Sequence, residues 1–266
     1  MKILNIRMIK PVLHYFNLAD EVVSFSTTRH GGVSKGKLAT LNINPHRGDE
    51  PSAVAENLQV VAAEIGVQAD KVIRLHQIHE THCLTVTDAF FRLSVAEQYE
   101  MEEGKDAVVT DCRNVCIGVH TADCVPVLFY DPVHHAIGAA HAGWRGTVQR
   151  IAQHTLRKMT ELYGTDPKEL KAVVGPCISQ KNFEVGQEVY DAFSAAGFPM
   201  ERIARMYEKW HINLPLCNQL QLEELGVPAA NILQSGICTY DNASDFFSAR
   251  ILKEGFGTIY TGITLK

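Results

Sequence analysis

The sequence lacks the features that mark membrane proteins and general nucleic-acid-binding proteins. No run approaches the 18 or more apolar residues that a membrane span needs. Lysine and arginine number 25 against 30 aspartate and glutamate, so the formal net charge is -5 and no basic surplus can neutralise phosphates. The chain begins MKILNIRMIKPVLHYF, where Arg7 and Lys10 interrupt the apolar run and no small-residue cleavage site follows. We therefore expect a cytoplasmic protein with no membrane and no nucleic-acid partner.

The chain also lacks the loops of the commonest nucleotide-binding and hydrolase folds. It contains no GxGxxG, Walker or GxSxG motif, which disfavours Rossmann, P-loop and common hydrolase enzymes. The seven cysteines are scattered, so reduced thiols are expected rather than a disulfide framework. No repeat or Pro/Ser-rich linker divides the 266 residues. One catalytic domain covering residues 1–266 is the simplest interpretation, while the oligomeric state stays open.

Short apolar runs alternate with amphipathic segments, which predicts an α/β or α+β fold built on a mixed sheet. Helices are expected at 49–66, where Pro51 and Ser52 fit the start, and at 147–163, where Gly164 fits the C-cap. Two further helices are expected at 184–196 and 214–225. Buried or half-buried strands are expected at 72–77, 115–119, 125–130, 135–140, 171–174, 231–237 and 259–263.

Residues that can bind a metal or move protons stand beside these apolar runs. Cys124 follows a Thr-Ala-Asp turn, His141 precedes a Gly-Trp-Arg-Gly turn, and His79 follows the run at 72–77. Burying a thiol or an imidazole without partners is costly, so we expect these groups to have partners. Two imidazoles and one thiolate suit a zinc ion, and three protein ligands leave a fourth position open for water or substrate.

Other roles for the same residues remain open from the sequence alone. Cys124 and His141 could form a nucleophile and its base, because an imidazole can draw off a thiol proton. Each member of the trio could also be a structural residue: a core cysteine or a hydrogen-bonded histidine. His76 and His79 are an odd number of residues apart, so along an extended segment at most one of them should point into the site.

Several polar residues are candidates for binding substrate. Arg29, Arg145 and Arg250 lie near glycines or small residues, where a guanidinium can offer a planar fork to phosphate or carboxylate. Asn42 and Gln77 stand beside apolar residues and could orient a substrate. Surface or turn roles are equally compatible with these five positions.

A set of longer motifs covers nearly the whole chain. They are FSTTRHGGVS (25–34), LNIN (41–44), HQIH (76–79), GVHTADCVPVLFYDP (118–132), AAHAGWRGT (139–147), GPCISQKNFEVGQEV (175–189), LPLCN (214–218) and CTYDNASDFFSAR (238–250). With these motifs the chain resembles a bacterial family labelled multicopper polyphenol oxidase or laccase-like. Its members are also described as zinc-dependent purine nucleoside phosphorylases and as peptidoglycan editing factors.

The resemblance implies a four-layer α/β/β/α domain of the type shared with a toxin class of cysteine hydrolases. It implies a catalytic zinc on His79, Cys124 and His141, and phosphate-dependent cleavage of adenosine, inosine, guanosine and methylthioadenosine with adenosine deaminase side activity. One alternative is a cysteine hydrolase or amidase acting on cell-wall precursor peptides, and another is a non-enzymatic metal-binding protein. A copper-dependent polyphenol oxidase is a further alternative, although a laccase needs paired HxH histidines and this sequence has none.

The sequence departs from the family pattern in three places. His120 occupies a position that is usually apolar, where it could add a ligand or an acid near the site. Glu80 and Thr81 replace the small residue that usually follows the His79 position. An arginine often found near the C-terminus is missing after Thr261-Gly-Ile263, which puts more weight on Arg29 and Arg250 for anion binding.

Overall fold

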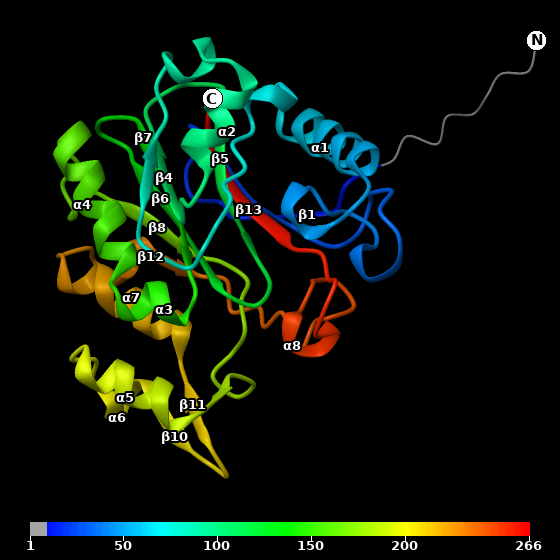
Figure 1. Ribbon diagram of the computed structural model, residues 1–266. Helices are drawn as coiled ribbons and strands as arrows, with labels where there is room; N and C mark the ends of the chain where they lie inside the picture. Colours follow the sequence, from blue (N-terminus) through cyan, green and yellow to red (C-terminus); the bar gives the residue numbers. More distant parts are fainter. Residues whose placement is uncertain (1–9) are drawn as a thin grey trace, which may run out of the picture.

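Two β-sheets lie face to face at the centre of the molecule (Figure 1). The computed structural model describes residues 10–266, so most of the N-terminal stretch weighed above as a signal segment lies outside the described residues. Within this range the larger sheet has six strands, in the order β12 (Ile232–Gln234), β8 (Lys171–Val174), β6 (Val125–Asp131), β7 (Ala136–Ala142), β4 (Ala107–Thr110) and β3 (Cys83–Thr85). It is a mixed sheet, because β6 and β7 pair antiparallel whereas β12 with β8 and β3 with β4 are parallel.

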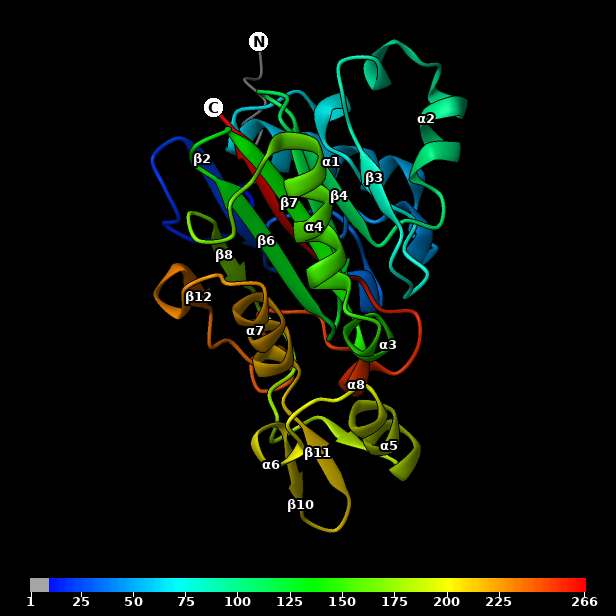
Figure 2. The ribbon, with the colours of Figure 1, turned by 90° about the vertical axis from the view of Figure 1, so that its left-hand side faces the viewer.

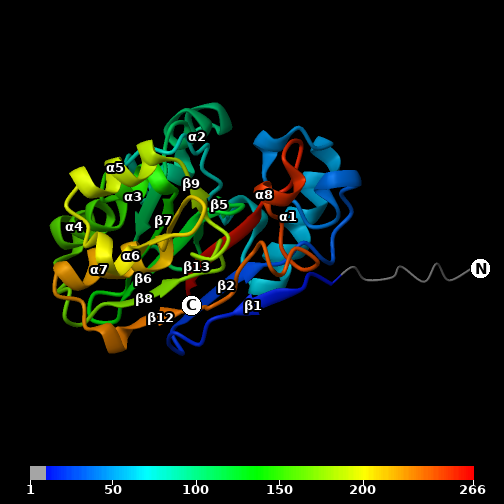
Figure 3. The same ribbon diagram turned by 90° about the horizontal axis from the view of Figure 1, so that it is seen from below.

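The smaller sheet is antiparallel, with four strands in the order β1 (Leu13–Tyr15), β2 (Val22–Thr27), β13 (Ile259–Leu265) and β5 (Cys116–Thr121). Helix α1 (Pro51–Ile65) covers its outer face and shares a core cluster with it. Helices α4 (Ile151–Tyr163) and α7 (Leu214–Glu224) cover the outer face of the larger sheet (Figure 2). The view from below shows the resulting order of helix, sheet, sheet and helix (Figure 3). The predicted α/β/β/α layering is confirmed, while the likeness to cysteine-hydrolase toxins stays a prediction.

Strand β6 shows why the apolar run at 125–130 folds as a strand buried on both faces. Successive side chains of a strand point to opposite faces of the sheet. Val127 and Phe129 belong to the core beneath the helices, and Leu128 and Tyr130 belong to the core between the two sheets. Both sets of side chains are removed from water on folding. Each large apolar side chain that is fully buried in this way stabilises the folded state by about 1.5–3 kcal/mol. A continuous apolar sequence follows from this double burial.

The predicted helices form with one interruption and one shortened end. The helix expected at 49–66 is α1, which starts at Pro51 and ends where Gly66 takes a φ of 76°. The helix expected at 147–163 is two helices, α3 (Trp144–Val148) and α4, because the chain turns at Arg150 with a φ of 65°. The helix expected at 214–225 is α7. In the segment 184–196 the first two residues form β9 (Glu184–Val185), and helix α5 follows at Gln187–Ala195.

Most predicted strands form, and one does not. The strands expected at 115–119, 125–130, 135–140, 171–174, 231–237 and 259–263 correspond to β5, β6, β7, β8, β12 and β13. The strand expected at 72–77 is wrong. This segment is a loop with isolated bridges between Val72 and Cys116 and between His76 and Glu103. Its apolar residues are buried although no neighbouring strand pairs with the segment along its length. An apolar run indicates burial, and here burial does not require a strand.

Smaller elements complete the described part of the chain. Strands β10 (Ala204–Met206) and β11 (Trp210–Ile212) form a small sheet with β9, which lies with α5 and α6 (Met200–Ile203) at the bottom of Figure 1. Helices α2 (Val95–Glu102) and α8 (Ala249–Leu252) stand in connections, and short 3-10 turns occupy Gly36–Leu38, Pro45–Arg47, Ala69–Lys71, Phe90–Arg92 and Ala229–Asn231. None of the helices within residues 10–266 has the length and apolar character that crossing a bilayer requires.

Candidate metal centre

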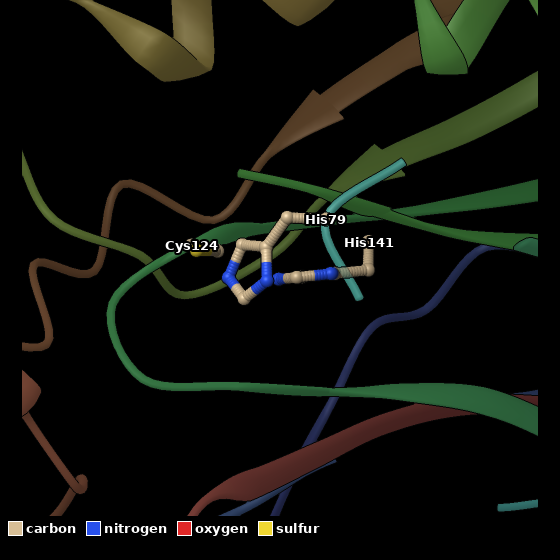
Figure 4. A group of neighbouring side chains, drawn as sticks. All are labelled: His79, Cys124 and His141. Atoms are coloured by element: carbon tan, nitrogen blue, oxygen red, sulfur yellow. The ribbon is translucent and has the colours of Figure 1, made fainter. Parts of the chain in front are cut away.

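The structure brings His79, Cys124 and His141 together at one end of the larger sheet (Figure 4). Their potential ligand atoms all lie within 4.8 Å of one another. Strand pairing explains two of the three positions, because Val125 lies opposite Ala142, so Cys124 at the start of β6 meets the end of β7 that carries His141. His79 comes from the loop before β3, and its ring lies edge-on to that of His141 with centroids 4.7 Å apart.

Gly143 allows the close approach of two of these side chains. A Cβ atom at this position would lie 3.0 Å from Cδ2 of His79 and 3.1 Å from Sγ of Cys124. Contacts that short would force the neighbouring atoms to shift by a few tenths of an ångström. The glycine of the AHAGWRG motif therefore keeps the space between the two donors free of side-chain atoms.

Asp106 anchors both histidines, although no feature of the sequence pointed to this residue. Its carboxylate is fully buried just before β4, and Oδ1 lies 2.7 Å from Nδ1 of His141. The same carboxylate accepts backbone N–H bonds from Ile78, His79 and Glu80 at 2.9–3.1 Å. These bonds hold His79 at a φ of 68°, a left-handed conformation that residues other than glycine rarely adopt. With Nδ1 of His141 engaged, its Nε2 is free to face a metal.

The electrostatics of the site favour a charged thiolate. Burial alone would raise the pKa of the Cys124 thiol, but the positive charge of His141 and hydrogen bonds from both histidines lower the pKa below the ordinary range. Burial would likewise lower the pKa of His141, yet the thiolate and Asp106 raise it above the ordinary range. Burial would raise the pKa of Asp106, but its bonds to His141 and to backbone N–H groups hold that pKa below the usual range.

This donor set fits a metal that prefers nitrogen and sulfur. Thiolate is the form of cysteine that binds metals, and Cys124 is placed to be a thiolate at neutral pH. A histidine whose other ring nitrogen bonds a buried carboxylate is the usual arrangement of a metal-ligating imidazole. His79, Cys124 and His141 together supply the two nitrogens and one sulfur of a zinc site with one open position.

We expect Asp106→Asn to weaken metal binding about 10- to 100-fold, because the amide keeps the shape but loses the charge and one acceptor oxygen. The measurement is competition for zinc between the protein and a chromophoric chelator. Asp131→Asn is a matched control. Asp131 is also buried and also bonds a histidine, His134, and two backbone N–H groups, but it lies outside the trio. Equal zinc affinity in the two variants would contradict an anchoring role for Asp106.

Two cavities meet at the trio and share Ala122 and Cys124 in their walls. The first, which we call the polar cavity, has a volume of about 190 Å³ and is lined by groups that include Asn44, His46, Arg47, His76, Gln77, His120 and Thr258. The second, the apolar cavity, has a volume of about 490 Å³ and is lined by Trp144, Ile178, Phe183 and Leu214 together with Asp123, Arg250 and Lys253. All three potential metal ligands line the polar cavity, and Cys124 also lines the apolar cavity.

His76 and His79 both line the polar cavity, but of the two only His79 belongs to the trio, which agrees with the expectation that at most one of them would point into the metal site. The alternation rule holds for a strand, and this segment is a loop with His79 in a left-handed conformation. The two residues nevertheless differ in role. His79 belongs to the trio, whereas Nδ1 of His76 bonds the Glu103 carboxylate at 2.6–2.7 Å and its ring stacks on His46 with centroids 4.1 Å apart.

Two of the predicted substrate-binding residues lie in the cavity walls. Gln77 lines the polar cavity, but its amide is paired with the backbone of His120 through two hydrogen bonds of 2.7 and 2.8 Å. Arg250 lines the apolar cavity, where Nη2 donates to the Glu184 carbonyl at 3.0 Å and the guanidinium lies over the ring of Phe183.

The other three predicted substrate-binding residues line neither cavity. Arg29 donates from Nε and Nη1 to the carbonyls of Ala39 and Ala243, at 3.0 Å each. Asn42 is fully buried, and its amide donates to Asp49 and to the Asn44 carbonyl. Arg145 is exposed, with its guanidinium 4.3 Å from the ring centre of Trp144.

The fold and the trio together define a four-layer α/β/β/α protein with a His-Cys-His site between two cavities. The family model described as multi-copper polyphenol oxidoreductase laccase matches residues 23–266. The chain belongs to this family, which confirms the resemblance seen in the motifs.

Curated relatives carry two enzyme names. A "Purine nucleoside phosphorylase" of Bacteroides thetaiotaomicron is 41% identical over 261 residues, covering 96% of this chain and 97% of the relative. A protein named "Adenosine deaminase RL5", from an unknown prokaryotic organism, is 36% identical over 257 residues, covering 96% and 98%. The solved structure of YlmD from Geobacillus stearothermophilus superposes with a TM-score of 0.87 at 29% identity, covering 94% of each chain.

Proposed function

We propose that this chain is a zinc-dependent purine nucleoside phosphorylase that cleaves adenosine, inosine, guanosine and methylthioadenosine and also deaminates adenosine. The observation that carries the proposal is the convergence of His79, Cys124 and His141 on one point beside two cavities. The names of the relatives support both activities. We further propose that residues 1–266 act as one catalytic domain in the cytoplasm, where the seven free cysteines would stay reduced.

In this proposal His79, Cys124 and His141 hold the zinc, and Asp106 fixes the orientation of the two histidines. When bound, zinc supplies a Lewis acid and lowers the pKa of a coordinated water to about 7, which serves deamination. Gly143 leaves the approach to the trio free of side-chain atoms.

The apolar cavity suits the purine. Trp144 and Phe183 offer flat apolar surfaces against which the base can pack. Cleavage of the glycosidic bond builds negative charge on the leaving purine. Arg250 and Lys253 are the cationic residues in this wall and are placed to stabilise that charge. Of the predicted substrate-binding residues, we propose direct purine contact for Arg250, and supporting roles for Arg29, Asn42, Gln77 and Arg145.

The decisive test combines metal analysis of the purified protein with an inosine assay. We expect about one zinc per chain, release of hypoxanthine only when phosphate is present, and ribose-1-phosphate as the second product. Adenosine should yield inosine in the absence of phosphate, because deamination needs only water. Release of free base at the same rate with and without phosphate would contradict the phosphorylase assignment.

A cysteine hydrolase acting on cell-wall peptides is a second candidate, favoured by one observation. The half-buried Cys124 thiol and the buried His141 lie close together, and their pKa directions favour thiolate and imidazolium, as in thiol-dependent hydrolases. The copper-dependent oxidase suggested by the family description has less support. The sequence has no HxH pair, and within residues 10–266 the trio is the one group of this kind that could hold a metal.

A further inference from the structure

We propose that the polar cavity is the oxyanion subsite of this enzyme, in which Arg47 and His120 hold inorganic phosphate against the ribose. The inference rests on the proposed nucleoside chemistry and adds the position of the second substrate. The sequence favoured Arg29 and Arg250 for anion binding. In this proposal the anion is bound instead by two residues that line the cavity next to the trio.

Arg47 is held so that the outer edge of its guanidinium stays available. It ends the 3-10 turn Pro45–Arg47, its Nε donates to the Phe256 carbonyl at 3.1 Å, and its guanidinium lies 4.2 Å from the ring centre of Phe256. These two contacts fix the plane of the group. Among residues 10–266, no acceptor bonds its two terminal nitrogens, and no carboxylate forms an ion pair with it. A pre-oriented fork of this kind is suited to the oxygens of a phosphate.

His120 offers a buried hydrogen-bond donor with no partner in the described chain. Its side chain is 4% exposed, Nδ1 lies 3.3 Å from Oγ1 of Thr258, and Nε2 is buried without a hydrogen bond to any of residues 10–266. Oγ1 of Thr258 accepts from Asn44, and its own hydrogen is available for donation to Nδ1 of His120. In the tautomer that accepts this bond, the proton of the neutral ring resides on the buried Nε2 of a side chain that lines the cavity.

An unsatisfied donor in a buried wall is costly unless a ligand completes it. Burial and the nearby positive groups keep the pKa of His120 well below its ordinary value, so the ring stays neutral at physiological pH. A neutral Nε2–H group beside the Arg47 cation matches an anion that accepts hydrogen bonds. A cationic ligand would be repelled by Arg47.

The charges around the polar cavity favour an anion. No aspartate or glutamate of the described residues is among its lining side chains. The Glu103 carboxylate nearby is bonded to His76. Burial raises the pKa of Glu102 to about 7 even though Arg74 opposes that rise, so Glu102 carries only part of a negative charge at neutral pH. Arg47 is therefore a cation in this wall without an acidic partner.

The position of the two cavities suits the geometry of the reaction. A lone pair of a hydrogenphosphate oxygen forms the new bond to the ribose C1′ carbon, while the electrons of the C1′–N9 bond leave with the purine. The proton of the hydrogenphosphate ends on the released purine, so the products are the free base and ribose-1-phosphate. The attacking and leaving groups lie on opposite sides of C1′. The polar and apolar cavities meet at Ala122 and Cys124, which places the ribose at their junction.

The test compares phosphate affinity in single variants of the zinc-loaded protein. Arg47→Met keeps an unbranched apolar stem but removes the guanidinium and its charge, and we expect the KM for phosphate in inosine phosphorolysis to rise about tenfold or more. Calorimetric titration with inorganic phosphate should show a similar rise in Kd. Adenosine deamination, which uses no phosphate, should fall much less. Arg205→Met is the matched control, because Arg205 is exposed on β10 and lies in neither cavity.

A second pair of variants isolates the donor of His120. His120→Leu removes the donor at similar volume and should raise the KM for phosphate about fivefold, whereas His120→Gln can place an amide N–H near the Nε2 position and should restore most of the affinity. Unchanged phosphate affinity in Arg47→Met would overturn the proposal. A rise in the phosphate KM in Arg250→Met instead would place the subsite in the apolar cavity and overturn it equally. If the unmodified enzyme shows no phosphorolysis, the proposed function fails, and the calorimetric titration still decides whether Arg47 and His120 bind phosphate.

Discussion

Cys124→Ala should abolish metal binding and both nucleoside activities together. The substitution removes the one sulfur donor and leaves two imidazoles, which cannot complete the three-ligand site. We expect zinc to fall from about one per chain to a small fraction of that, and turnover of inosine and adenosine to fall about a thousandfold or more. Elemental analysis and the two assays on the same preparation provide the measurement. Alanine fits the space of a half-buried cysteine, so the fold should persist, which circular dichroism can verify.

The matched control for this variant is Cys217→Ala. Cys217 is fully buried on α7 in the core beneath the larger sheet and does not belong to the trio. Its loss should reduce the free energy of unfolding modestly while zinc content and activity remain. Full zinc occupancy in Cys124→Ala would show that Cys124 is not a ligand. The nucleophile hypothesis would then gain, since it needs the thiol and not the metal.

Much of the central fold could be predicted because local patterns and global burial agree. In β6 both faces are buried, and the sequence shows an unbroken apolar run. In α1 the signals at both ends are local, with Pro51 at the start and Gly66 in a left-handed conformation at the end. The segment 72–77 failed because buried residues in a loop resemble a short strand. The three strands β9, β10 and β11 were missed because they are only two or three residues long and mostly not buried.

The trio was easier to find than its surroundings. Cys124 directly precedes β6 and His141 lies near the end of the neighbouring strand β7, and distinctive motifs mark both. Asp106 was missed because its partners are 26 to 35 residues away, and a carboxylate ahead of a strand has no local mark of being buried. The polar cavity was missed because its lining residues are even farther apart in the sequence. Its walls bring Arg47 and His120 together with Phe256 and Thr258. Spacing along the chain does not reveal a contact such as that of Arg47 with Phe256, which are 209 residues apart.

The second large effect concerns the reactivity of Cys124, which should depend on the metal. A zinc-bound thiolate has its electron pair committed, so in the loaded enzyme Cys124 should react slowly with an alkylating agent such as iodoacetamide. Removing zinc with a chelator should abolish turnover and raise the alkylation rate of Cys124 about tenfold or more, because its pKa in the metal-free site lies below the ordinary thiol range. Returning zinc before alkylation should restore activity, whereas returning it afterwards should not.

Peptide mapping must identify the labelled residue, and the other thiols help to make this readout selective. Burial raises the pKa of Cys83 and Cys116 to about 12 and also raises the pKa values of Cys177 and Cys217, so these thiols are protonated and slow to react at neutral pH. A free catalytic thiolate would behave in the opposite way. It would be labelled quickly in the presence of zinc, and activity would survive the chelator. Rapid labelling of Cys124 in fully metallated, active enzyme would therefore exclude Cys124 as a zinc ligand and leave the thiol hydrolase as the better assignment.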